Sequence, residues 1–233
     1  MKKLGILGGM GPFASALFFE MLTRSQKASS EQDYINIFLS SNPSVPDRTN
    51  FINGGGENPV SALAKTAKAL ERIGADAIAI PCVTAHFFYD EISASVAIPI
   101  LNIVEETAKH LFERGVKKAG LLATEGTVRR GLFGDAFSKY MIETILPGDG
   151  AQKTVNDMIY QNLKKGSPVD GSAFFKIAAG LRERGAETVV LGCTELSLVR
   201  RDFGIADGFT DALEILAVSS LVFCGAELAG PSA

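Results

Sequence analysis

Two of the three cysteines in the chain follow apolar runs that are typical of buried strands. Cys82 ends the run "IAIPC", and Cys193 ends the run "VVLGC". A threonine follows each within two residues, as Thr84 and Thr194. A single buried cysteine is most often a small core residue, so its place in the sequence alone does not make it reactive. Two thiols that share a pocket can remove a proton from a carbon atom and return one from the opposite side.

The sequence repeats itself in a way that pairs these two cysteines. "KKLGIL" at 2–7 returns as "KKAGLL" at 117–122, and "GADAIAIPC" at 74–82 returns as "GAETVVLGC" at 185–193. The offsets are 115 and 111 residues, so the spacing is nearly the same in both halves of the chain. An internal repeat of this kind predicts two related structural units, with one cysteine at the same position in each.

Short apolar runs alternate with longer amphipathic runs along the chain, which predicts parallel strands joined by crossover helices. The predicted strands are 3–8, 34–40, 76–81, 117–123, 142–146 and 187–191. The predicted helices are 12–28, 58–73, 84–94, 103–114, 128–139, 151–165, 170–184 and 211–227. The run "IPILNI" at 98–103 is expected to cross between the two halves.

The expected fold is therefore α/β, with two pseudo-symmetric open domains, mostly parallel sheets and the active site in the cleft between them. We expect residues 1–100 plus 209–233 to form the first domain and 101–208 the second. Open parallel sheets bind ligands at the carboxyl ends of their strands, where both cysteines are predicted to lie.

Both cysteines also precede a stretch that is expected to be helical. Free N–H groups at the start of a helix favour a thiolate, and a cysteine that normally titrates near ~8.5 is expected to have a pKa closer to neutrality there. Inversion at carbon by a thiol and a thiolate needs no cofactor. Cys224 lies in an apolar helix without polar neighbours and is expected to be a core residue.

Five motifs occur in a characteristic order: "GILGGMGP" at 5–12, "NPSVPDRT" at 42–49, "PCVTAH" at 81–86, "LLATEGT" at 121–127 and "LGCTEL" at 191–196. In order and spacing they resemble the aspartate racemase branch of the cofactor-independent Asp/Glu racemase family. The resemblance runs from Leu4 to about Thr210. It implies two α/β domains around the active site, Cys82 and Cys193 as the two acid/base thiols, and commonly a homodimer.

The resemblance also implies which residues hold the substrate. Two prolines in "NPSVPDRT" are expected to stiffen a loop that presents Arg48 and Thr49, and an arginine fork suits a carboxylate. Without the resemblance, Arg48 beside Asp47 would be interpreted as a solvated ion pair; with it, Arg48 is expected to hold the distal carboxylate. In "MIYQNLKKG", Lys164 falls where aspartate racemases carry a second cation, with Lys165 as the alternative.

The glycine and threonine motifs are expected to complete the pocket. "GGMG" lacks the spacing of nucleotide-binding loops, so its glycines are expected to let the backbone approach the substrate, with Met10 lining the pocket. Thr124 and Thr127 offer hydroxyls at the equivalent strand end of the second half, although Thr127 is equally a helix N-cap. Backbone N–H groups after each cysteine, with Thr84 and Thr194, are expected to stabilise charge on the reacting carboxylate.

Two further side chains, His86 and Glu195, follow the cysteines closely. The sequence leaves open whether they assist the neighbouring thiols or only cap and pack their helices.

One residue departs from the family pattern. The usual first motif reads Pro-Cys-Asn-Thr, and this chain has Val83 where the asparagine belongs. That asparagine typically donates to the α-carboxylate or amino end of the substrate, and a valine side chain cannot. Losing such a contact costs about 1–3 kcal/mol. Either the substrate differs, or another donor compensates, or activity is weak.

Three functions follow from these residues. The first is an amino-acid racemase of the Asp/Glu type, independent of pyridoxal phosphate, that inverts Cα with two thiols. The second is another reaction in the same cleft, such as an isomerase, a decarboxylase or a hydantoin-type racemase. The third is a non-catalytic binder of a small acid. The presence of both cysteines favours the first.

Composition bears on the partners, metal sites and cellular setting to be expected. The chain has 233 residues of which 46% are apolar, enough for one large domain or two small ones. It has 23 basic against 26 acidic residues and no basic stripe. A nucleic-acid partner is therefore not expected. Two histidines without metal-ligand spacing make a metal site unexpected. Three widely spaced cysteines favour a reducing, cytoplasmic setting, and the apolar stretch 215–226 is shorter than the ~20 residues that span a membrane.

Overall fold

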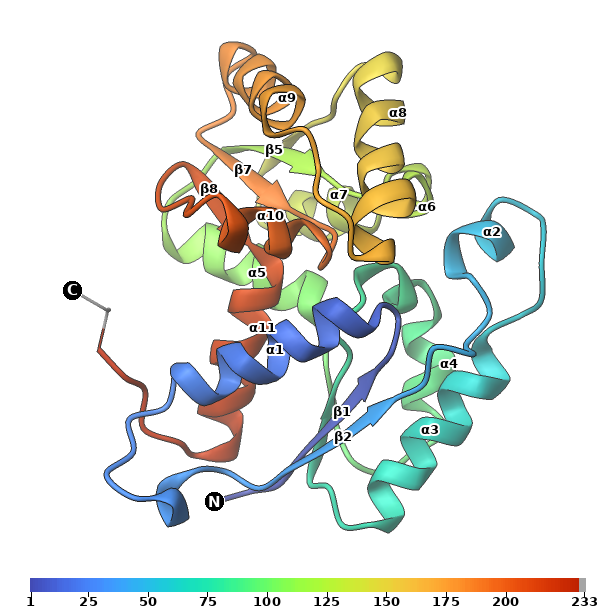
Figure 1. The fold of residues 1–233 in the computed structure, drawn as a ribbon, viewed down its shortest axis with the longest axis vertical. Coiled ribbons are helices and arrows are strands. Elements are labelled where there is room, and N and C mark those ends of the chain that lie inside the picture. Colours follow the sequence, from blue (N-terminus) through green and yellow to red (C-terminus); the bar gives the residue numbers. More distant parts are fainter. Residues whose placement is uncertain (231–233) are drawn as a thin grey trace.

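The first apolar runs form a four-stranded sheet in which every pair of neighbours is parallel. We analysed a computed structural model, which describes residues 1–230 (Figure 1). The strand order is β2-β1-β3-β4. The strands are β1 (Leu4–Gly8), β2 (Ile37–Ser41), β3 (Ala77–Ala79) and β4 (Ile100–Leu101). Because β1 and β3 are buried along their whole lengths, they read as continuous apolar runs rather than alternating ones.

The second half repeats this arrangement. Its sheet has the order β6-β5-β7-β8, again with parallel neighbours. The strands are β5 (Lys118–Leu122), β6 (Glu143–Ile145), β7 (Thr188–Leu191) and β8 (Phe209–Asp211). β5 therefore occupies the place of β1, and β7 the place of β3. The predicted fold of two related α/β halves with parallel sheets is confirmed.

Helices and short turns connect the strands and cover the sheets. Those of the first half are α1 (Pro12–Arg24), α2 (Arg48–Ile52), α3 (Val60–Arg72), α4 (Tyr89–Ser93) and the 3₁₀ turns Glu31–Asp33 and Val83–Phe88. Those that follow are α5 (Ile103–Glu113), α6 (Glu125–Arg129), α7 (Leu132–Lys139), α8 (Asp149–Asp157), α9 (Gly171–Glu183), α10 (Leu196–Asp202) and α11 (Ala212–Cys224). A π-helical turn, Met158–Asn162, and a 3₁₀ turn, Leu163–Lys165, continue α8.

The last helix joins the two halves. α11 starts directly after β8 of the second sheet and packs against both α1 and α5 (Figure 1). One apolar core runs through both halves and includes Leu4, Phe18, Leu121, Leu191 and Leu216. This shared core fixes the two sheets relative to each other. The domain boundaries at 100 and 208 stay predictions; β8 lies just beyond the second of them and pairs with β7.

Several elements differ from those expected. β4 and β8 were not predicted as strands, and they are only two and three residues long. The run 98–103 contains β4 and then leads into α5, whose N-cap is Asn102. The expected helix 128–139 is two helices, α6 and α7, because Gly131 has a positive φ of 62° between them. α2 and α10 are helices that the sequence pattern did not indicate.

None of the helices within residues 1–230 is long and apolar enough to cross a membrane.

Candidate active site

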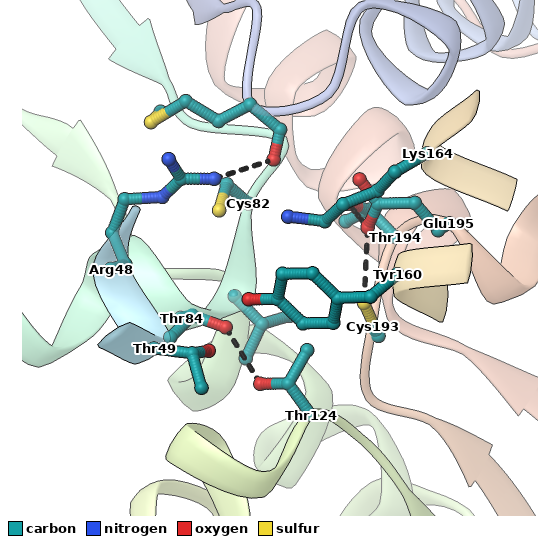
Figure 2. A pocket seen from close by; sticks show the side chains of 12 residues that line it. Arg48, Thr49, Cys82, Thr84, Thr124, Tyr160, Lys164, Cys193, Thr194 and Glu195 are labelled. Carbon is teal, nitrogen blue, oxygen red and sulfur yellow. Dashed lines mark hydrogen bonds between the residues drawn. The ribbon is translucent and has the colours of Figure 1, made fainter. Parts of the chain in front are cut away.

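A pocket lies between the two halves at the carboxyl ends of β1, β3, β5 and β7 (Figure 2). In each sheet these are the strands at which the order reverses direction, the place where open parallel sheets bind ligands. The pocket is lined by Met10, Arg48, Thr49, Cys82, Val83, Thr84, Thr124, Tyr160, Lys164, Cys193, Thr194 and Glu195. All the site residues expected from the sequence line it except Thr127, which lies behind Thr84 and Thr124.

The pocket is closed around a small space. Its cavity volume is about 10 Å³, which is room for about one water molecule. An amino acid is several times larger, so some of the lining side chains must move before one enters.

The two cysteines occupy equivalent positions in the two halves. Cys82 follows β3 and Cys193 follows β7, and each residue is only 5% exposed. Both are free thiols. They approach the same pocket from different halves (Figure 2), as the internal repeat predicted. Cys224, the third free thiol, is buried in α11, in agreement with its expected place in the core.

A carboxylate lies directly beside one thiol. Cys193 Sγ donates to Glu195 Oε2 at 3.0 Å, and Glu195 Oε1 accepts from Gly11 N at 3.0 Å. Glu195 is 3% exposed, so this contact lies in a poorly solvated place. Burial, followed by the Glu195 charge, raises the pKa of Cys193 well above its usual value. The expectation of a lowered pKa is wrong for this cysteine, because burial and the carboxylate outweigh the start of a helix that begins only at Leu196.

Threonine hydroxyls connect the halves beneath the thiols. Thr84, Thr124 and Thr127 form a triangle with oxygen distances of 3.0 to 3.1 Å. Thr124 rather than Thr127 caps α6, because its side chain accepts from Thr127 N. Thr194 donates to Pro81 O at 3.1 Å and thereby crosses from the second half to the first.

The Arg48 side chain is buried and held by backbone carbonyls. Nη1 donates to Val45 O at 3.2 Å and Pro46 O at 3.1 Å, and Nη2 donates to Met10 O at 3.2 Å. Within residues 1–230, neither Arg48 Nε nor Thr49 Oγ1 has a hydrogen-bond partner, although both atoms are buried. The Nε–H and one Nη2–H point the same way from a guanidinium, so this edge is a fork that suits a carboxylate.

Arg48 is therefore not the solvated ion pair with Asp47 that the sequence alone suggested. Its expected loop is the first turn of α2, which Asp47 caps by accepting from Asn50 N at 2.8 Å. Burial works against the charge of the guanidinium, but the neighbouring Cys82 and Asp47 outweigh it, so the pKa of Arg48 is raised.

Lys164 and Tyr160 reach into the pocket from the turns after α8 (Figure 2). Lys164 Nζ lies 3.9 Å from Asp47 Oδ2 and 4.4 Å from the centroid of the Tyr160 ring. The alternative cation, Lys165, instead donates to Gln161 on the surface. Tyr160 OH donates to both carboxylate oxygens of Asp47, at 3.2 and 3.1 Å.

Tyr160 was missed in the sequence. It precedes Lys164 by four residues, about one helical turn, so the two share a face of this segment. That spacing was the available signal. Burial raises the pKa of Tyr160, so its hydroxyl stays a donor at neutral pH.

The hydrogen bonds of the His86 ring go to backbone groups and not to the Cys82 thiol. Its Nδ1 lies 3.0 Å from Cys82 O, and its Nε2 accepts from Ile103 N at 3.4 Å. Because an amide N–H can only donate, Nε2 is the acceptor and Nδ1 carries the proton towards Cys82 O. Burial lowers the pKa of His86. The ring is thus a neutral link between the backbone after β3 and the start of α5, as the packing interpretation expected.

Acidic, thiol and imidazole side chains do not gather into a metal site in the part of the chain that the structure describes: no group of three or more could hold an ion there.

Known proteins share this arrangement. The family model described as Asp/Glu/Hydantoin racemase matches residues 7–212. The broad specificity amino-acid racemase RacX of Bacillus subtilis is 30% identical over 200 residues, covering 84% of this chain and 86% of the relative. The solved structure of the Picrophilus torridus aspartate racemase superposes with a TM-score of 0.88 at 31% identity, covering 98% of this chain and 96% of the other.

An aspartate racemase homologue from Pyrococcus horikoshii has a TM-score of 0.78 at 27% identity, covering 97% of this chain and 100% of the other. A glutamate racemase from Francisella tularensis, at 18% identity and a TM-score of 0.62, shares the fold. The sequence match, the repeated sheets and the two thiols on one pocket agree: the chain belongs to the Asp/Glu/Hydantoin racemase family, whose amino-acid racemases are cofactor-independent isomerases.

Proposed function

We propose that this chain racemises an amino acid, with Cys82 and Cys193 as the two acid/base groups. The observation that carries the proposal is the placement of both thiols at equivalent strand ends on a single closed pocket. A base and an acid on opposite sides of Cα invert its configuration, and neither step needs a cofactor.

The two steps exchange the roles of the thiols. A thiolate on one side takes the Cα proton, and the electron pair spreads into the α-carboxylate. The thiol on the other side then gives its proton to Cα, which inverts the centre and leaves a thiolate there. Because its pKa is raised, Cys193 is suited to the protonated state.

Charge that develops on the α-carboxylate needs donors that are already in place. Backbone N–H groups after each cysteine, with Thr84 and the unpartnered Thr49 hydroxyl, are suited to this task. The Thr194 hydroxyl already donates to Pro81 O, so we assign it to holding the two halves together. The Thr124 and Thr127 hydroxyls bond to Thr84, so we assign them to holding it.

For the side chain of the substrate, the Nε and Nη2 edge of Arg48 and the Lys164 ammonium favour a distal carboxylate. Aspartate is therefore the first candidate, in keeping with the name of the Picrophilus relative. Val83 gives the pocket an apolar wall, with one donor fewer for the amino-acid end. The broad specificity in the name of the Bacillus relative is compatible with a range wider than aspartate alone.

We further propose that the chain acts as a homodimer in the cytoplasm, as the resemblance and the free thiols suggest. Sedimentation equilibrium measures its mass directly, and a monomer at micromolar concentration would refute the dimer.

Deuterium exchange tests the reaction. The protein is incubated in D₂O with the L- or D-form of aspartate, glutamate and other amino acids, and Cα deuterium and configuration are followed by NMR and chiral chromatography. We expect exchange with inversion of at least one amino acid. Exchange without inversion, loss of mass by decarboxylation, or binding without exchange would each contradict the proposal.

Single-thiol variants sharpen this test. Cys82→Ala and Cys193→Ala should each lose at least about 10³-fold in racemisation, because one proton transfer has no partner. The remaining thiol should still exchange the Cα proton of one enantiomer, and the two variants should prefer opposite enantiomers. Cys224→Ala is the matched control and should racemise like the unaltered protein. If both variants prefer the same enantiomer, the thiols do not face opposite sides of Cα.

A further inference from the structure

Three side chains connect the two halves at the outer wall of the pocket. Asp47 comes from the first half, and Tyr160 and Lys164 come from the turns after α8 in the second. Tyr160 OH donates to the Asp47 carboxylate at 3.2 and 3.1 Å, and Lys164 Nζ lies 3.9 Å from it. The Asp47 and Lys164 side chains are 35% and 20% exposed, whereas Cys82 and Cys193 are each 5% exposed as whole residues. The contact therefore lies between solvent and the thiols.

Asp47 also controls the residues that follow it. Its carboxylate accepts from Asn50 N and so fixes the first turn of α2, which carries Arg48 and Thr49. Arg48 and Thr49 are the two pocket residues with buried, unpartnered polar atoms. Whatever holds Asp47 therefore also helps to fix the turn that carries these two residues.

The small cavity leaves no room for an amino acid unless its lining moves. With a volume of about 10 Å³, the cavity admits about one water molecule, so an amino acid enters only after some contact across the cleft has opened. Tyr160 and Lys164 lie on a π-helical turn and the 3₁₀ turn after it, a departure from α-helical hydrogen bonding that is frequent at functional sites. Other contacts between the halves, such as Thr194 to Pro81 and Glu195 to Gly11, are buried.

We propose that Asp47, Tyr160 and Lys164 form a latch that opens to admit the substrate and closes over it, and that Tyr160 is a positioning residue of the site. In the closed state the Tyr160 hydroxyl holds Asp47, and through it Arg48 and Thr49, in place for the substrate. The role in catalysis rests on the proposed racemase function, whereas the control of access to the thiols does not.

Thiol alkylation measures the opening of the latch without any substrate. The protein is treated with iodoacetamide, and the labelling of each cysteine is followed by peptide mass spectrometry. A buried thiol reacts through the fraction of molecules that are open. Tyr160→Phe removes one hydrogen bond to a charged group, and we expect Cys82 and Cys193 to react about tenfold faster or more. Cys224, which is buried in α11 and does not line the pocket, serves as the internal control and should keep its rate.

Two more variants test whether faster labelling comes from the latch rather than from any change of a tyrosine. Asp47→Asn keeps the cap on α2, because asparagine caps as well as aspartate, but loses the attraction to Lys164; it should also accelerate both pocket thiols. Tyr34→Phe alters an exposed tyrosine and should change none of the three rates. Unchanged labelling of Cys82 and Cys193 in both latch variants would overturn the proposal, as would equal acceleration of Cys224, which indicates general unfolding.

Kinetics separate positioning from chemistry. If the wild-type protein racemises an amino acid, Tyr160→Phe should raise KM about tenfold or more and change kcat much less, because only the closed fraction binds productively. A fall in kcat at constant KM would contradict the positioning role. If the wild-type protein racemises nothing, the proposed function fails, while the labelling result still decides the latch.

Discussion

At the scale of single residues, the two thiols have unlike neighbours. Cys193 donates to the Glu195 carboxylate at 3.0 Å, whereas Cys82 lies near the buried guanidinium of Arg48 and contributes to the raised pKa of that group. A neighbouring carboxylate favours the protonated form of a thiol. The two halves thus surround their thiols with groups of opposite charge.

Glu195→Gln tests the cause of the raised Cys193 pKa. Glutamine keeps an oxygen for the Gly11 N–H but removes the negative charge next to Sγ. We expect the pKa of Cys193 to fall, so its thiolate should appear at lower pH. The measurement is the pH dependence of Cys193 alkylation, resolved by mass spectrometry.

The matched control is Glu125→Gln, which alters a surface carboxylate paired with Arg129. It should leave the Cys193 titration where it is. A Glu195→Gln variant whose Cys193 titrates at the same or higher pH would mean that burial alone sets the raised pKa.

At the scale of elements, the start of α11 holds a carboxylate that the site does not use. Asp211 ends β8 and caps α11 by accepting from Leu213 N at 2.9 Å, and it also accepts from Ser197 Oγ at 2.7 Å. Burial raises the pKa of Asp211 to about 6. An unfolded aspartate titrates near ~3.9. Between that pH and about 6, Asp211 keeps its proton in the folded chain but loses it in the unfolded chain. The contribution of Asp211 to stability therefore falls as pH rises from about 4 to about 6.

Asp211→Asn should remove this pH dependence while keeping the cap. Relative to the wild type, the variant should be more stable at pH 7 than at pH 4 by roughly 3 kcal/mol, the linkage value for about two pKa units. Urea unfolding at both pH values measures the difference.

Asp170→Asn is a control for which the change in stability with pH is expected to have the opposite sign. Asp170 caps α9, and the hydrogen bond from Ser172 lowers its pKa. The stability that it adds is present above the unfolded pKa and is lost as pH falls. If Asp211→Asn shows the same direction as Asp170→Asn, then Asp211 is ionised in the fold well below pH 6.

The sequence predicted long elements better than short ones. β1 and β5, with their neighbours β3 and β7, follow from buried apolar runs that recur at nearly one offset. β4 and β8 have too few residues for any period to show, and their pairing depends on strands far away in the chain. The role of Tyr160 depends on a π-helical turn and on a carboxylate 113 residues away. The four-residue spacing to Lys164 indicates a shared face, but the contact with Asp47 itself leaves no pattern in a single sequence.

At the scale of the whole molecule, the site depends on how closely the two halves meet. Gly126 in α6 faces Thr49 of α2, and a Cβ there would lie 2.9 Å from Thr49 Oγ1 and 3.1 Å from its Cα. The absence of a side chain at this position lets the halves close around the pocket. The sequence shows the glycine within a motif but not the residue it faces.

Gly126→Ala should therefore place a methyl group against Thr49 and push the two halves apart. We expect kcat/KM to fall at least about tenfold, because small displacements of groups that bind substrate have large effects on rate. Gly134→Ala, in α7, is the control, since a Cβ there meets nothing within 4 Å. It should leave activity unchanged and raise stability by about 0.5–1 kcal/mol. Full activity of Gly126→Ala would show that this contact does not set the geometry of the pocket.

Thermodynamics limits how far the unequal surroundings of the two thiols can affect the kinetic constants of the two directions. For a racemase, substrate and product are mirror images with equal free energies in water, so the equilibrium constant is unity whatever the protein does. The ratio kcat/KM must then be equal for the L-to-D and D-to-L directions, even though Glu195 stands beside one thiol and Arg48 near the other. The two directions can still differ in kcat and in KM separately. Any difference must be the same factor in both, so that the direction with the higher kcat also has the higher KM.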